Sequence, residues 1–228
     1  MTKEVFDAIE QYMQEMMGDS AHDCLHIYRV LSQALEIGAH YPIDTDILIA
    51  SCLLHDIGRQ AQFANPSLCH AMEGGKLAFA FMKSLGWPEE QCLHIQACIS
   101  THRFRADNPP QSMEAKILFD ADKLDVTGAL GIARTLLYKG QVGEPLYTVD
   151  DDFQIQNGHA QDDPESFLKE YHFKLKTLYH HFFTPEANAI AQKRKVLMEA
   201  FYAELLEEID IDPLRQLRCI ANDSPSNR

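Results

Sequence analysis

The 228-residue chain has little positive charge: 20 lysines and arginines stand against 34 aspartates and glutamates, a formal net charge of -14 at pH 7. No basic stripe stands out along the sequence. Proteins that bind nucleic acid by neutralising phosphates carry such a stripe, so we expect no nucleic-acid partner. The acid surplus suits a protein that concentrates divalent cations, although a solvated acidic surface is the commoner explanation.

Long apolar runs and a charged-then-apolar N-terminal segment are also missing. A membrane-spanning helix needs about 20 consecutive apolar residues, and a secretory leader needs a basic segment before an apolar one. We therefore expect a cytoplasmic chain with no membrane partner. No CxxC pair occurs, and most cysteines lie in apolar helical contexts typical of reduced core thiols; the six are Cys24, Cys52, Cys69, Cys92, Cys98 and Cys219.

The alternation of apolar and polar residues that marks a half-buried strand is almost absent. Apolar residues recur instead at helical spacing, and 228 residues suit one sizeable core. We therefore predict an all-α fold in a single domain over 1–228, with a loop at 60–68. The predicted helices are 5–17, 23–40, one from a cap at Asp44 to the His55 region, 69–85, 88–102, 113–124 (capped by Ser112), 125–138, 164–183 and 185–209.

The core of this domain is expected at about 20–138, and the C-terminal helices at 164–209. Between them, the segment 139–163 is polar and acidic, and Gly143, Pro145 and Gly158 interrupt it. A connection this long is more often functional or disordered than structural, so we predict that it serves as a lid over the site. The polar tail at 222–228 is expected to be frayed.

The stretch 53–59, Leu-Leu-His-Asp-Ile-Gly-Arg, closes an apolar run that indicates a buried helix. His55 and Asp56 are costly to bury there unless something pairs with them. A divalent metal is the usual partner, because neutral imidazole and carboxylate are both good ligands. Arg59 follows on the next turn, close enough to hold an anion beside that metal.

Other helices also present histidine or aspartate near an end or on one face. His22 and His26 lie four residues apart and share a face, as do Asp122 and Asp125, whereas Asp120 points elsewhere. Taken singly, each has a plainer explanation. His26 alone is more often a hydrogen-bonded core histidine, and Asp120 and Asp125 can cap helices or pair with Lys123 and Arg134.

Taken together, His26, the His55-Asp56 pair and Asp122 resemble the HD superfamily of metal-dependent phosphohydrolases. The stretch 53–58 is nearly the family consensus, and Ala-Asp-Lys-Leu at 121–124 looks like the segment that supplies its last aspartate. The resemblance runs from about His22 to Tyr138. It extends to the small bacterial branch of uncharacterised HD-domain hydrolases, some members of which are similar to nucleotide pyrophosphohydrolases.

The resemblance implies an HD-type helical bundle with a divalent metal held by His26, His55, Asp56 and Asp122. The metal could be Mn, Ni, Fe, Zn or Mg. It would lower the pKa of its bound water and neutralise charge building on phosphorus. Some HD proteins add two histidines in the interval between the HD pair and the last aspartate, so that Asp56 bridges two ions. His70 and His102 lie in that interval; we expect one ion and leave the second open.

Cations near these residues are candidates for holding the substrate phosphates, since guanidinium binds phosphate in a bidentate way. They are Arg59, Arg103 and Lys123, each of which could equally be a surface cation; His70 could also bind phosphate. Many HD hydrolases carry an acidic residue where this chain has Arg59, so the proton carrier is open. Asp125 and Glu73 are candidates for it, and the predicted catalytic residues are Asp56, Arg59, Lys123 and Asp125.

The leading hypothesis is a metal-dependent phosphohydrolase that acts on a small phosphorylated metabolite, above all a nucleotide, as a monomer or homodimer. One alternative is a di-iron oxygenase that uses His70 and His102. The other is a non-catalytic ligand-binding helical domain that keeps its metal for structure.

Overall fold

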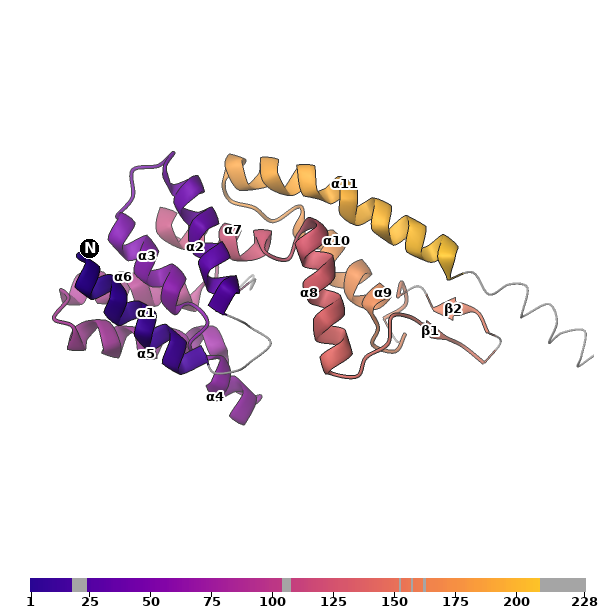
Figure 1. Cartoon of the computed structure of the whole chain (residues 1–228), viewed down its shortest axis with the longest axis horizontal. Coiled ribbons are helices and arrows are strands. Elements are labelled where there is room, and N and C mark those ends of the chain that lie inside the picture. The colour runs from indigo at the N-terminus through magenta and orange to yellow at the C-terminus, as the bar shows by residue number, and fades with distance from the viewer. Residues whose placement is uncertain (18–23, 104–107, 152, 157, 162, 210–228) are drawn as a thin grey trace, which may run out of the picture. The chain divides into compact units, whose positions relative to one another are not determined.

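The computed structural model describes residues 1–17, 24–103, 108–151, 153–156, 158–161 and 163–209 (Figure 1). His22 and the tail at 222–228 lie outside these residues. The described chain is helical apart from one small hairpin, which confirms the all-α prediction. In chain order its elements are α1 Lys3–Met17, α2 Cys24–Gly38, α3 Thr45–Leu54, α4 Arg59–Ala64, α5 His70–Ser84, α6 Glu89–Ser100, α7 Met113–Leu124, α8 Gly128–Gln141, β1 Thr148–Val149, β2 Ile155–Gln156, α9 Phe167–Glu170, the π-helical turn η1 Tyr171–Leu175, α10 Lys176–Leu178 and α11 Pro185–Glu208.

The chain packs into two compact units. Among the described residues, the first combines those of 1–125 with 182–190, and the second combines those of 126–181 with 191–209. Every candidate site residue belongs to the first unit. A single domain over 1–228 with a core at about 20–138 stays a prediction. None of the described helices is both long and apolar enough to cross a bilayer.

Helix α3 is the central element of the first unit and contacts α1, α2, α5, α6 and α7. It is apolar on almost every side, as a helix enclosed by others must be, and Leu48, Leu53 and Leu54 are fully buried. Asp44 caps it as predicted, because its carboxylate accepts the backbone N–H groups of Asp46 and Ile47. The helix ends at Leu54, so His55 and Asp56 follow deep inside the unit.

The turn after α3 packs directly against the start of α5. A Cβ atom at Gly58 would lie 2.2 Å from the carbonyl oxygen of His70 and 2.5 Å from the backbone nitrogen of Gly74. Only a residue without a side chain allows this approach, which brings the first residue of α5 beside the His55-Asp56 turn.

The predicted loop at 60–68 was wrong over its first half, where the chain forms α4. The Arg-Gln-Ala-Gln stretch consists of good helix formers. Asn65 is extended because the following Pro66 disfavours helical backbone before it, and the helix therefore ends at Ala64.

Hydrogen bonds join the residues just before α11 to helix α7 within the first unit. Asp120 is fully buried and accepts the backbone N–H groups of Phe183 and Thr184 and the Thr184 hydroxyl. Asp120 thus fixes the residues just before α11, while Thr184 caps that helix by accepting the N–H of Ala187. Ser112 caps α7 as predicted, accepting the N–H of Ala115.

In the second unit, α8 begins at Gly128 rather than at 125 as predicted, and it continues to Gln141. Gly128 has a φ of +62°, and a Cβ atom there would lie 2.9 Å from the Cβ of Arg194 on α11. This glycine therefore allows α11 to approach α8 closely.

The remainder of the second unit departs from the prediction in two places. The single helix expected at 164–183 is interrupted by the π-helical turn η1, and the helical run ends at Leu178. Within 139–163 the strands β1 and β2 pair antiparallel, with Thr148 opposite Gln156. The lid function of this segment stays a prediction.

Candidate metal centre and active site

Three helices bring the four predicted ligands together. His26 lies in the first turn of α2, His55 and Asp56 follow α3, and Asp122 lies in the last turn of α7. The His26 Nε2 atom is 3.4 Å from Asp122 Oδ1, 3.7 Å from Asp56 Oδ2 and 3.3 Å from His55 Nε2. His55 Nε2 is 3.8 Å from both carboxylates. Side chains distant in sequence thus converge within the reach of one ion.

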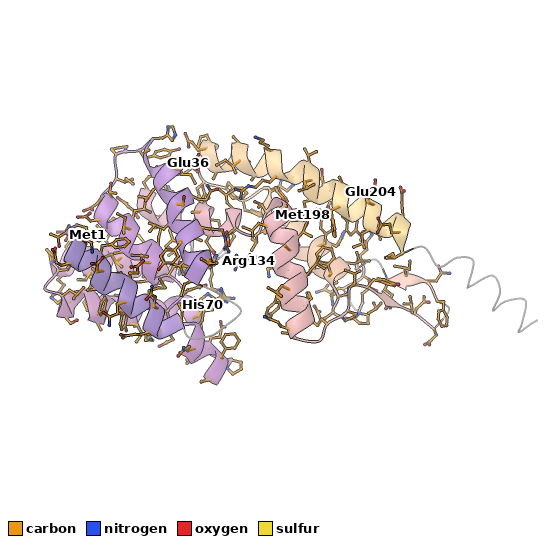
Figure 2. The ribbon with its side chains drawn as sticks, in the orientation of Figure 1. Met1, Glu36, His70, Arg134, Met198 and Glu204 are labelled. Atoms are coloured by element: carbon orange, nitrogen blue, oxygen red, sulfur yellow. The ribbon has the colours of Figure 1, made fainter. Side chains whose placement is uncertain are left out.

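A second group forms on the other oxygen of Asp56. His70 is the first residue of α5 (Figure 2), and His102 follows α6. Their Nε2 atoms lie 3.5 and 3.6 Å from Asp56 Oδ1 and 3.3 Å from each other. Asp56 is therefore shared between two groups of three residues, each able to hold a metal ion.

Each histidine of the two groups uses its Nδ1 atom for a fixed hydrogen bond. His55 Nδ1 donates to the Cys52 carbonyl at 2.8 Å, and His102 Nδ1 donates to the Ile99 carbonyl at 2.6 Å. A carbonyl only accepts, so the proton is on Nδ1 and the Nε2 lone pair is left for a metal. His26 Nδ1 is 2.7 Å from Asp125, and His70 Nδ1 is 2.7 Å from the Gln62 side-chain oxygen.

The chemistry of these donors fits divalent ions. Asp56 Oδ2 is buried and has no hydrogen-bond partner in the described part of the chain. In the second group, the Nδ1 atoms of His70 and His102 are both engaged in hydrogen bonds, and the two Nε2 atoms face each other at 3.3 Å. A buried acceptor without a partner is costly, and a cation in the first group would satisfy Asp56 Oδ2, while one in the second group would bind the two facing Nε2 atoms.

The protonation states also suit metal binding. Burial lowers the pKa of His55 to about 4, and burial together with the charge of Arg59 lowers the pKa of His70 to about 2, so both are neutral. Burial alone would raise the pKa of Asp56, but Arg59 and His55 outweigh it and hold it well below the usual value. Burial would lower the pKa of His26, but its hydrogen bonds to Asp122 and Asp125 raise it to about 9. An ion that binds His26 at neutral pH therefore displaces a proton.

Asp125 lies behind His26, on the Nδ1 side of the ring. Its carboxylate also accepts Arg29 Nε at 2.8 Å and Arg29 Nη2 at 3.1 Å, and the residue is 4% exposed. This position favours an orienting role over the general-base role considered from the sequence. Glu73, the other base candidate, pairs with Lys76 at 2.8 Å.

The three cations predicted to bind phosphate take different positions. Arg59 Nε donates to Asp56 Oδ1 at 3.0 Å, and Lys123 Nζ donates to Asp122 Oδ2 at 2.8 Å and to the His102 carbonyl at 3.3 Å. Arg103 Nη1 is 3.7 Å from Cys69 Sγ. Two of the three cations thus lie directly on the carboxylates of the site.

Sequence reasoning did not single out Arg29 or Gln62, which support His26 and His70. Arg29 lies three residues after His26, about one helical turn, and that spacing is the only local signal for it. Gln62 lies on the helix that was predicted as a loop, so no pattern indicated which way its side chain points.

We expect Asp125→Asn to weaken metal binding by about 10- to 100-fold, because the partner that orients His26 would lose its charge. Arg29→Met removes the guanidinium that holds Asp125. It should also weaken metal binding, but by a smaller factor. Titration of the metal-free protein with Mn²⁺ measures both effects. Glu36→Gln, which removes an exposed carboxylate from the same helix as His26, is the matched control. An Asp125→Asn protein with wild-type affinity would show that His26 needs no such support.

The fold and the site define an all-α protein with a buried cluster of histidines and aspartates that could hold metal ions. Residues 25–127, which include every ligand candidate, match the HD domain. The chain is 27% identical over 206 residues to Bacillus subtilis YpgQ, covering 89% of this chain and 93% of that protein. It resembles the crystal structure of a Bacillus thuringiensis HD-superfamily hydrolase with a TM-score of 0.68 at 26% identity, covering 90% of this chain and 97% of the other.

The structure of YpgQ in complex with ADP matches equally well, with a TM-score of 0.68 and 26% identity over 90% of this chain and 98% of that one. The 3'-5' exoribonuclease YhaM of B. subtilis is 30% identical over 115 residues, which are 44% of this chain and 37% of YhaM. The chain therefore contains an HD domain at residues 25–127 and is similar over most of its length to YpgQ and to a hydrolase of the HD superfamily. The family predicted from the sequence is confirmed.

Proposed function

We propose that this protein is a metal-dependent phosphohydrolase that acts on a small phosphorylated metabolite, above all a nucleotide. The observation that carries the proposal is the shared carboxylate of Asp56, whose two oxygens face two separate pairs of histidines. Support for a nucleotide comes from YpgQ, which has been crystallised with ADP. YhaM, which matches only in part, is named a 3'-5' exoribonuclease.

A divalent ion bound here would generate a nucleophilic hydroxide at neutral pH and neutralise charge building on the phosphoryl group. The protein's own residues would supply the rest. His26, His55 and Asp122 would hold the ion with Asp56, and the fixed Nδ1 hydrogen bonds keep the imidazoles in the ligating tautomer. Lys123 and Arg59 would turn from the carboxylates toward the phosphate oxygens, and Arg103 would bind them from the side of His70.

The comparisons lend no support to the di-iron oxygenase alternative. A non-catalytic domain with a structural metal is distinguished from a hydrolase by turnover alone. Relatives described as hydrolases favour turnover.

The test is phosphate and pyrophosphate release from nucleoside mono-, di- and triphosphates, measured on protein stripped of metal and reloaded with Mn²⁺, Ni²⁺ or Mg²⁺. We expect release only from the reloaded protein, and the product identifies the bond that is cut. A short RNA included in the panel should stay intact, since the acidic chain lacks a basic stripe. If protein shown to hold metal releases neither phosphate nor pyrophosphate from any of these nucleotides, the proposal is overturned.

A further inference from the structure

We propose that Arg59 controls the occupancy of the second ion position, the group of Asp56, His70 and His102, by holding the carboxylate oxygen which that ion requires. The inference rests on the proposed metal-dependent function and concerns the regulation of the same site.

The two oxygens of Asp56 are in different situations. Oδ2 faces His26 and His55 at 3.7 and 3.8 Å and has no hydrogen-bond partner in the described chain. Oδ1 faces His70 and His102 at 3.5 and 3.6 Å, and it also accepts Arg59 Nε at 3.0 Å. The first position is therefore open to a cation, whereas a guanidinium already pairs with the second.

This contact opposes an ion in two ways. Arg59 occupies a lone pair of Oδ1, and its permanent positive charge lies beside the place where a divalent ion would sit. Repulsion between charges at such distances is large where water is largely excluded, and Asp56, His70 and His102 are at most 2% exposed. We infer that the first ion binds tightly and the second binds weakly as long as Arg59 remains on Asp56.

The local structure allows Arg59 to leave. It is the first residue of α4, and its side chain is 26% exposed, unlike the buried carboxylate that it contacts. A phosphate group offers a guanidinium a bidentate partner in place of the single Nε contact. Phosphate that draws Arg59 away would free Oδ1, so the binding of phosphate and of the second ion should reinforce each other.

Helix α4 also supports the second position from its other end. Gln62, one turn after Arg59, accepts the hydrogen bond from His70 Nδ1 at 2.7 Å. A single short helix therefore carries both the group that orients His70 and the cation that competes for Asp56. An acidic residue at position 59 would attract the second ion, whereas Arg59 opposes it.

Calorimetric titration of the metal-stripped full-length protein with Mn²⁺ tests the proposal, together with the electron paramagnetic resonance signal of two Mn²⁺ ions coupled through one carboxylate. Wild type should bind one equivalent tightly and a second weakly. Arg59→Met should tighten the second equivalent by at least about tenfold and change the first much less. Arg103→Met removes a nearby charge without freeing Asp56 Oδ1, and it should leave the large difference between the two equivalents in place. Inorganic phosphate should tighten the second equivalent in wild type but not in Arg59→Met.

The outcomes separate this inference from the function on which it rests. If Arg59→Met leaves the second affinity unchanged, or if Arg103→Met strengthens it equally, Arg59 has no specific control over the site. The metal-dependent function would survive either result. If wild type binds no Mn²⁺ at all, the metal centre itself fails, and the proposed function fails with it.

Discussion

Replacing Asp56 by asparagine is expected to remove metal from both groups and to lower phosphohydrolase activity by at least about a thousandfold. Each oxygen of this carboxylate serves one pair of histidines, so no other single side chain is common to both groups in the described chain. An amide oxygen is a weaker, uncharged ligand, and its NH₂ group would point a donor at one histidine pair. Metal stabilisation of the transition state is worth several kcal/mol, and each 1.36 kcal/mol is a factor of ten in rate.

Two further variants make this result specific. His102→Gln should lose the second ion only, and His55→Gln should weaken the first position while the His70–His102 pair remains intact. Metal content by mass spectrometry and kcat measured on the same samples separate the three variants. Asp56→Asn with wild-type metal content would contradict the shared-carboxylate arrangement, and full activity without metal would contradict metal-dependent hydrolysis.

The parts of this fold set by local sequence could be predicted. The apolar run of α3, the cap at Asp44 and the His55-Asp56 pair after the helix all follow from neighbouring residues. Helix α4 was missed because a six-residue helix has little periodicity to detect. The π-helical turn in α9–α10 was missed because its sequence does not differ visibly from that of an ordinary helix.

The residues of the site could be predicted from the sequence, but their positions relative to one another could not. Helical spacing placed Asp122 and Asp125 on a shared face, yet the structure gives them different roles, one beside the His26 Nε2 atom and one beside its Nδ1 atom. The second group was left open for the same reason. His70 and His102 belong to different helices, and only the packing of α5 and α6 against the α3 turn brings them to Asp56.

That packing depends on a glycine, and Gly58→Ala is expected to destabilise the first unit by more than about 3 kcal/mol. The backbone at Gly58, with φ -81° and ψ -2°, is open to other residues, so the whole effect is steric. The added methyl group would lie 2.2 Å from the His70 carbonyl oxygen, which is backbone and can move only with α5. His70 would then move with its helix, and the second ion position would be lost before the first.

A graded series of glycine replacements tests this explanation by urea unfolding and Mn²⁺ titration. A Cβ atom at Gly74 would meet its nearest neighbours at 3.3 to 3.5 Å, so Gly74→Ala should cost much less than Gly58→Ala. Gly140, inside α8, has open space around the same position, and Gly140→Ala should stabilise the protein by up to about 1 kcal/mol through helix propensity. If Gly58→Ala unfolds at the wild-type urea concentration and still binds a second ion, the close contact of the α3 turn with α5 does not position His70. The convergence on Asp56 would then have to come from the packing of α6 alone.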